Sequence, residues 1–129
     1  MKVLLVEDDY DLIDMYDTAL SAAGYSVATV GNAQEALDYL ENKKVDVVVL
    51  DLLLPGHNGL DVLHELRTYE DWRKLPVIIL SNLNCEDVGI SAEHLRELGV
   101  AKYLIKSQTK PHVLVQAIAK ICEPKRVNL

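Results

Sequence analysis

The chain has 129 residues, half of them hydrophobic and 26% charged, and its formal net charge is −7. This length is enough for one ordinary domain with its own core and too short for two, and no apolar run could span a bilayer. The acidic balance argues against general binding to nucleic acids or membrane surfaces, because phosphate contacts need Lys and Arg.

Five short runs of β-branched or aliphatic residues have the length of β-strands. They comprise residues 2–6, 26–30, 45–50, 76–80 and 101–105. Because these runs are apolar along their length, we expect both faces of the sheet that they form to be covered.

Five segments with a helical spacing of apolar residues alternate with these strands. Their apolar stripes run over residues 12–23, 33–40, 60–66, 95–98 and 114–121. Asn32 is a suitable N-cap for the second helix, and Pro111 lies near the first turn of the fifth. The alternation predicts an α/β fold, a single doubly wound domain with one parallel sheet and right-handed crossovers.

Polar side chains stand where four of the strands end. They are Glu7, Asp8 and Asp9 after the first strand, Asp51 after the third, Ser81 after the fourth and Lys106 after the fifth. The carboxyl ends of the strands form the ligand-binding edge of a doubly wound sheet, so we expect these groups to converge there.

The carboxylates in this set indicate a divalent cation. Two carboxylates about 4 Å apart repel by about 4 kcal/mol at an effective dielectric constant of about 20, so the cluster needs a neutralising partner. The available ligands are oxygens, which favours Mg²⁺. A carboxylate beside Mg²⁺, a Lys and a hydroxyl is a natural phosphoryl acceptor, because the two cations stabilise the spread negative charge.

Four motifs, in this order and each at a strand end, resemble the receiver domain of the two-component response regulators. They are VEDD at 6–9, LDLLLPGHNG at 50–59, VIILS at 77–81 and YLIK at 103–106. The resemblance covers residues 1–123 as a receiver domain and leaves residues 124–129 as a short tail. It implies a flavodoxin-like domain with a five-stranded parallel sheet in the order 2-1-3-4-5 and five helices.

The resemblance also implies a phosphoacceptor and a metal site. Asp51 would accept the phosphoryl group. The metal, Mg²⁺ or Mn²⁺, would be held by Asp51, by Asp8 directly, by the backbone carbonyl of Leu53 and, mainly through water, by Glu7. Spacing alone leaves Asp8–Asp9 open as the acidic pair; the register of the family selects Glu7–Asp8, and Asp9 then starts a helix.

Four residues would respond to the phosphoryl group. Lys106 would pair with it, Ser81 would be the switch hydroxyl, and Tyr103 would be the switch aromatic residue. Asn82, which replaces the small residue usual beside that hydroxyl, would either narrow access to the site or donate its amide to a phosphoryl oxygen.

The resemblance implies a signalling domain and not a classical enzyme. A histidine kinase or phosphotransfer protein would supply the phosphoryl group, and the domain would catalyse its own phosphorylation and slow dephosphorylation. Movement of Ser81 and rotation of Tyr103 would then remodel a face that binds a downstream protein of unknown identity. We expect no direct contact with nucleic acid or a membrane.

The start of the chain and its cysteines favour a cytoplasmic location. MKVLLVEDD turns acidic too early for a secretion signal. Cys85 and Cys122 match no metal or redox spacing, so both are expected to be reduced thiols.

Three further features depart from the family pattern. Ser107 follows Lys106 where the family usually has Pro in a cis peptide, so we expect a trans bond there. Leu53 and Leu83 offer no hydrogen bond to the water that would hydrolyse the phosphoryl group, so a long-lived phosphorylated form is expected. The segment 82–91 is longer than usual, which predicts an extended loop or an irregular start of the fourth helix.

Three other functions fit the sequence less well. An FMN carrier would need a phosphate-cradling loop after the first strand, where VEDDYD places negative charge. A haloacid-dehalogenase-type phosphatase would need a second Asp where Leu53 stands. The main alternative is a degenerate receiver that acts as a phosphorylation-independent protein-binding module, because Ser107 and Asn82 depart from the pattern, although Asp51 and Lys106 are both present.

Overall fold

The five apolar runs form one parallel sheet in the computed structural model, which describes residues 1–122 except for the side chains of His57 and Cys122. The strands are β1 (Lys2–Val6), β2 (Ser26–Val30), β3 (Val47–Leu50), β6 (Val77–Ser81) and β7 (Val100–Ile105). They lie in the order β2-β1-β3-β6-β7, and every neighbouring pair is parallel. The predicted strand order is therefore confirmed, while the expected tail at 124–129 lies outside the described residues.

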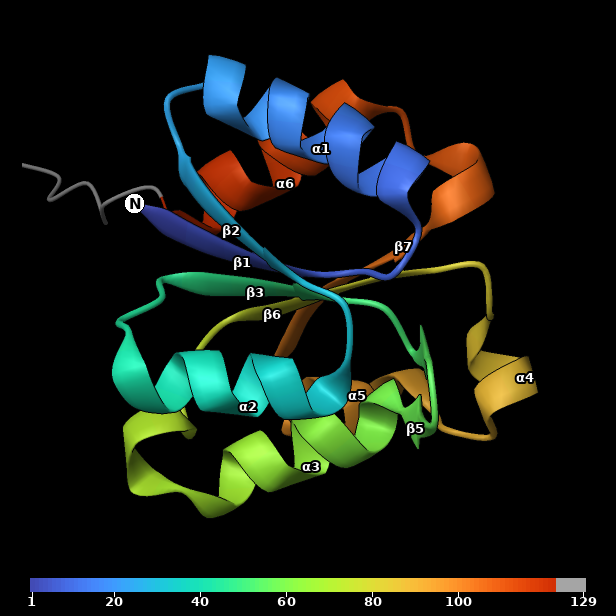
Figure 1. The fold of residues 1–129 in the computed structure, drawn as a ribbon. Helices are drawn as coiled ribbons and strands as arrows, with labels where there is room; N and C mark the ends of the chain where they lie inside the picture. The colour runs from blue at the N-terminus through green and yellow to red at the C-terminus, as the bar shows by residue number, and fades with distance from the viewer. Residues whose placement is uncertain (123–129) are drawn as a thin grey trace, which may run out of the picture.

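Helices cover both faces of this sheet, as Figure 1 shows. One face carries α1 (Tyr10–Ala22) and α6 (Pro111–Cys122), and the other carries α2 (Ala33–Asn42), α3 (Gly59–Thr68) and α5 (Ala92–Glu97). Asn32 caps α2 as predicted, because its side chain accepts a hydrogen bond from the Glu35 N–H at 2.9 Å. Among the described residues, every helix is too short or too polar to cross a bilayer.

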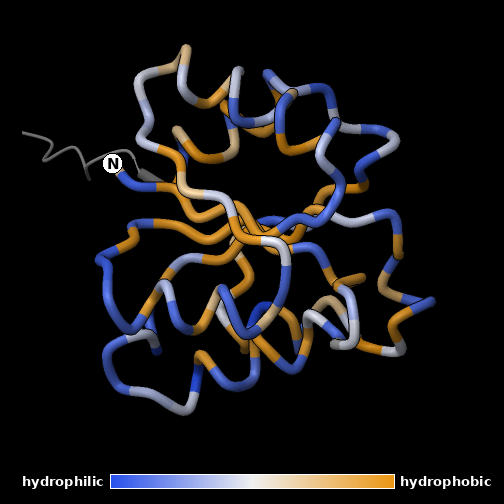
Figure 2. The backbone as a smooth tube through the Cα atoms, viewed as in Figure 1, coloured by the Kyte–Doolittle hydropathy of each residue, from blue (hydrophilic) through white to orange (hydrophobic). Residues whose placement is uncertain are grey.

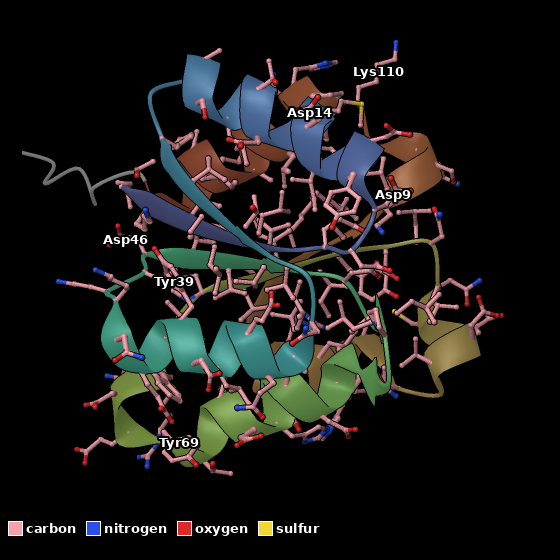
Figure 3. The ribbon with its side chains drawn as sticks, in the orientation of Figure 1. Asp9, Asp14, Tyr39, Asp46, Tyr69 and Lys110 are labelled. Atoms are coloured by element: carbon pink, nitrogen blue, oxygen red, sulfur yellow. The ribbon has the colours of Figure 1, made fainter. Side chains whose placement is uncertain are left out.

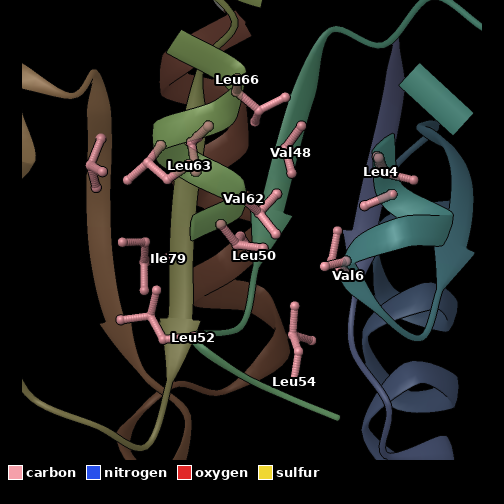
Figure 4. Packing of buried hydrophobic residues seen from close by; sticks show 14 of the residues in the cluster. Leu4, Val6, Val48, Leu50, Leu52, Leu54, Val62, Leu63, Leu66 and Ile79 are labelled. Carbon is pink, nitrogen blue, oxygen red and sulfur yellow. The ribbon is translucent and has the colours of Figure 1, made fainter. Parts of the chain in front are cut away.

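The sheet separates two apolar cores. Alternate residues of β1 face opposite sides, so Val3 and Leu5 pack with α1 and α6, whereas Leu4 and Val6 pack with α2 and α3. Figure 4 shows the second core, and Figure 2 shows hydrophobic segments gathered along the central strands with hydrophilic segments around them. Close packing on both faces holds the strands rigidly, and with them the groups at the strand ends.

The expected fourth helix is split in two, so six α-helices stand where five were expected among the described residues. The first piece is α4 (Cys85–Val88), which Asn84 begins with a capping box and Gly89 ends in the left-handed region at φ 73°. Ser91 then caps α5 through the His94 N–H at 3.1 Å. The irregular start expected within 82–91 is thus a separate short helix.

A short hairpin follows β3 and Asp51. It consists of β4 (Leu53–Leu54) and β5 (His57–Asn58), which pair antiparallel. Gly59 comes next, and its N–H donates to the Leu52 carbonyl at 2.9 Å. A Cβ atom at Gly59 would lie 2.3 Å from the Asp51 carbonyl oxygen, so only glycine allows α3 to start this close to the acceptor.

Candidate functional site

The sheet brings the predicted polar groups to one edge. Val6 pairs with Leu50, so the residues that follow them, Glu7 and Asp51, leave the sheet side by side. Ser81 ends β6 opposite Ile105, and Lys106 follows directly. These side chains therefore meet because their strands end in register, which is the placement that the sequence predicts.

Lys106 joins the two buried carboxylates of this edge. Its Nζ lies 2.5 Å from Glu7 Oε2 and 2.5 Å from Asp51 Oδ2, and the two acids are only 1% and 4% exposed. Burial alone would lower the pKa of Lys106, but hydrogen bonds and charges from Asp51 and Glu7 outweigh that effect and raise the pKa. Burial raises the pKa of Glu7, and its contacts with Lys106 and the Asp9 N–H offset part of that rise. Lys106 thus holds a full positive charge directly beside Asp51.

Both carboxylate oxygens of Asp51 have defined partners. Oδ2 accepts from Lys106, and Oδ1 accepts from the backbone N–H of Leu53 at 3.0 Å. The contact with Leu53 links the carboxylate to the first residue of the hairpin. The Asp51 side chain is therefore held in one orientation at the rim of its strand.

Three carboxylates are close enough together to share a cation. One oxygen from each of Glu7, Asp8 and Asp51 lies within 4.8 Å of the other two, and Asp8 is the exposed member. Glu7 Oε1 also accepts from the N–H groups of Asp8 and Asp9, at 3.1 Å each. A set of carboxylate oxygens open to solvent on one side suits a hard cation that keeps some of its water, so the residues present fit Mg²⁺ or Mn²⁺.

Asp9 has a different task from its two acidic neighbours. Its Oδ1 accepts from the N–H groups of Asp11 at 3.0 Å and Leu12 at 3.3 Å, which makes it the N-cap of α1. Figure 3 labels it at the beginning of that helix. The prediction that Asp9 starts a helix is confirmed.

Ser81 and Tyr103 are connected through the backbone of one residue. Ser81 is fully buried, and its Oγ accepts from the Leu83 N–H at 3.3 Å. The Tyr103 hydroxyl donates to the Leu83 carbonyl. Burial, followed by electrostatic interactions with Cys85, Asp87 and Asp51, raises the pKa of Tyr103 to about 12. The two residues predicted to switch thus contact the same short segment between β6 and α4.

Asn82 contacts the loop after Lys106. Its Oδ1 accepts from the Ser107 N–H at 3.1 Å, and both residues are exposed. The described residues contain no cis peptide bond, so the trans bond predicted between Lys106 and Ser107 is confirmed. The sequence suggested two roles for Asn82, narrower access to the site or a hydrogen bond to a phosphoryl oxygen, and the contact with Ser107 is neither of them. Ser107, unlike Pro, brings a backbone N–H, but the local sequence does not indicate which group accepts from it.

Comparison with known proteins agrees with this geometry. The family model described as the response regulator receiver domain matches residues 3–119. The transcriptional regulatory protein QseB of Escherichia coli O157:H7 is 36% identical over 121 residues, which make up 94% of this chain and 51% of that protein. The alginate biosynthesis transcriptional regulatory protein AlgB of Pseudomonas putida is 33% identical over 127 residues, 98% of this chain but only 27% of that protein. The chain thus spans about half, or less, of these curated relatives.

A solved structure supports the same relationship. The phosphorylated cyanobacterial phytochrome response regulator RcpA superposes with a TM-score of 0.78 at 28% identity, over 98% of this chain and 96% of that one. The fold, the convergence of acids and lysine at the sheet edge and the family match over most of the chain lead to one conclusion. The chain belongs to the receiver domain family of the two-component response regulators.

Proposed function

We propose that Asp51 accepts a phosphoryl group from a phosphohistidine of a histidine kinase or phosphotransfer protein, and that this switches a protein-interaction face. One observation carries the proposal. The Asp51 carboxylate lies 2.5 Å from the Lys106 ammonium and belongs to a cluster with the oxygens of Glu7 and Asp8. A negatively charged phosphoryl group entering this site meets a fixed positive charge next to the atom that attacks it.

The transfer would exchange one bond to phosphorus for another. A carboxylate oxygen of Asp51 bonds to phosphorus while the bond between phosphorus and the imidazole nitrogen of the donor breaks. Lys106 already contacts the acceptor oxygen, so its ammonium needs only a short movement to pair with a phosphoryl oxygen. Ser81 offers its hydroxyl from the neighbouring strand end.

A cation at the acidic cluster would neutralise the charge on the phosphoryl oxygens. Asp8 suits the role of direct ligand because it is exposed, whereas both oxygens of Glu7 already accept hydrogen bonds or contact Lys106. Glu7 would therefore act mainly through water. Asp51 and the backbone carbonyl of Leu53 would complete the set of protein ligands.

The response to phosphorylation would pass from Ser81 to Tyr103. Movement of the Ser81 hydroxyl toward the phosphoryl group breaks its contact with the Leu83 N–H, and the Leu83 carbonyl is the group that holds Tyr103. The segment that starts α4 then changes together with Tyr103. The partner that reads this change would be a protein, since a net charge of −7 disfavours nucleic acid.

The direct test uses Mg²⁺ and the small donor acetyl phosphate, with intact-protein mass spectrometry as the readout. The wild type is expected to gain one phosphoryl group, and Asp51→Asn none. Asp8→Asn and Asp9→Asn form a matched pair, because only Asp8 belongs to the carboxylate cluster. Asp8→Asn should weaken Mg²⁺ binding by at least about tenfold, whereas Asp9→Asn keeps its capping oxygen and should bind as the wild type does.

Two results would overturn the proposal. One is a folded wild type that gains no phosphoryl group from acetyl phosphate or from a phosphohistidine donor. The other is an Asp51→Asn protein that is labelled as well as the wild type. The first result would leave the phosphorylation-independent binding module as the better description, and the second would place the phosphoryl group on a residue other than Asp51.

A further inference from the structure

Two positions that depart from the family pattern meet in the structure. Asn82 directly follows β6, and Ser107 lies in the 3-10 turn η2 (Lys106–Gln108) that follows β7. The Ser107 N–H donates to Asn82 Oδ1 at 3.1 Å. The two substitutions therefore act as a pair: one brings an extra backbone donor, and the other brings the acceptor for it.

This contact lies where the sheet ends. The last paired residues of the two strands are Ser81 and Ile105, and beyond them the chains separate toward α4 and η2. Oδ1 of Asn82 reaches across that gap to the chain that leaves β7. The side chain thus extends the connection between the two strands by one hydrogen bond beyond the end of the sheet.

The far end of the turn is fastened separately. The Thr109 hydroxyl donates to the Ile105 carbonyl at 2.7 Å, and the Thr109 N–H donates to the Lys106 carbonyl at 3.2 Å. Buried Tyr16 donates its hydroxyl to the Thr109 carbonyl at 3.3 Å. Asn82 therefore holds η2 on the side that faces β6. Tyr16 and Thr109 hold the same turn on the side that faces α1.

Lys106 is the first residue of this turn. Its ammonium lies 2.5 Å from both Glu7 and Asp51, so a shift of the turn backbone would move the point from which this side chain reaches the two carboxylates. We propose that Asn82 is a positioning residue, which holds the Lys106 ammonium against Asp51 by binding the Ser107 N–H. This inference rests on the proposed role of Asp51 as phosphoacceptor.

A double-mutant cycle tests whether Asn82 acts through that N–H. Asn82→Ala should slow phosphorylation of Asp51 by acetyl phosphate about three- to tenfold, because a displaced Lys106 ammonium stabilises the transferring phosphoryl group less well. The same loss is expected in a Ser107→Ala background, which keeps the N–H. In a Ser107→Pro background, which lacks it, adding Asn82→Ala should change the rate less than about twofold.

Both residues are exposed, so water replaces the lost contact and the fold keeps its stability. The melting temperature of Asn82→Ala should therefore stay within about 2 °C of the wild type. An equal loss of rate in the Ser107→Pro background would overturn the inference and assign the Asn82 amide to the phosphoryl group itself. An unchanged rate in Asn82→Ala would overturn it as well.

A second measurement needs no phosphorylation. In the metal-free protein, nuclear magnetic resonance follows exchange of the Ser107 amide proton and the signal of the Lys106 ammonium. Asn82→Ala should speed the exchange and broaden the ammonium signal, while Ser107→Ala should leave both unchanged. If neither changes in Asn82→Ala, the positioning role is wrong. If both change while the wild type is never phosphorylated, the positioning role stands and the proposed function fails.

Discussion

Leu53 places an aliphatic side chain beside the acceptor, with 58% of its surface exposed. With Leu83 it lines a hollow of about 290 Å³ next to the site. Asn58 and Asp87 also line this hollow, but an oxygen of each is engaged in capping α3 and α4. The two leucines themselves offer no hydrogen bond to a water that approaches a phosphoryl group on Asp51, so slow hydrolysis remains the prediction.

Leu53→Asn should therefore shorten the lifetime of the phosphorylated protein several-fold, because an amide at this position can hydrogen-bond the attacking water. The matched control is Leu53→Met, which changes the shape of the side chain but adds no hydrogen-bonding group. Both changes are at an exposed position and should leave the fold intact. Mass spectrometry over time measures the decay of the phosphorylated form in each variant. Equal decay rates in Leu53→Asn and Leu53→Met would refute the proposed effect of the amide.

The start of α3 depends on a residue that has no side chain, Gly59. A Cβ atom at Gly59 would lie 2.3 Å from the Asp51 carbonyl oxygen and 2.7 Å from Leu52 Cα. Both neighbours are backbone atoms, so they can yield only if the acceptor loop itself moves. The position of Asp51 thus depends on the absence of a side chain at the first residue of the next helix.

We expect Gly59→Ala to lower the free energy of unfolding by about 1–3 kcal/mol through this overlap and to slow phosphorylation of Asp51. Gly31→Ala is the matched control, because a Cβ atom there has no neighbour nearer than 4.0 Å. It should change stability by less than about 0.5 kcal/mol. Denaturant unfolding of the two variants provides the comparison, and similar losses in both would show that the close approach at Gly59 is not the cause.

The elements differ in how well local sequence predicts them. The five strands follow from continuous apolar runs, because both faces of the sheet are buried. The helices α1, α2, α3 and α6 follow from helical spacing of apolar residues, because each helix buries one face. The break between α4 and α5 has local signals as well, in Asn84, Gly89 and Ser91. Those residues are equally common in loops, so the sequence left the choice between a loop and an irregular helix start open.

The site shows the same difference between local and long-range information. Glu7, Asp51 and Lys106 were predictable because each directly follows a strand and parallel strands share an edge. The contact between Asn82 and Ser107 was not, because it depends on the register of β6 against β7. That register shifts near Val77 and Ile78, and nothing in the local sequence marks the shift.

For the whole molecule, alkaline pH should weaken the fold through Tyr103. Its pKa is raised from 10.0 to about 12, first by burial and then by nearby negative charges, so the folded state favours the neutral phenol. Above pH 10 the unfolded chain loses this proton more readily than the folded one. The contribution of Tyr103 to the free energy of unfolding is therefore complete below about pH 10, and it is lost as the pH rises through about 12.

Tyr103→Phe removes this ionisation and should show a shallower loss of stability between about pH 10 and 12 than the wild type. The variant also loses the hydrogen bond to Leu83, which shifts its stability at every pH, so the slope is the quantity to compare. Tyr16 has a raised pKa as well and contributes equally to both proteins. Thermal unfolding across this range measures the slopes; parallel curves would contradict the assignment.

The link between Ser81 and Tyr103 is made by the main chain of position 83, not by its side chain. Nineteen of the genetically encoded amino acids would supply the same N–H and carbonyl, and proline alone would break the link by removing the N–H. A different side chain at position 83 can therefore alter the protein surface, or the access of water to Asp51. The connection between the Ser81 hydroxyl and the Tyr103 ring would be kept. If the proposed switch operates, partner choice and phosphoryl lifetime would be free to diverge among relatives of this domain while the contact from Ser81 to Tyr103 is kept.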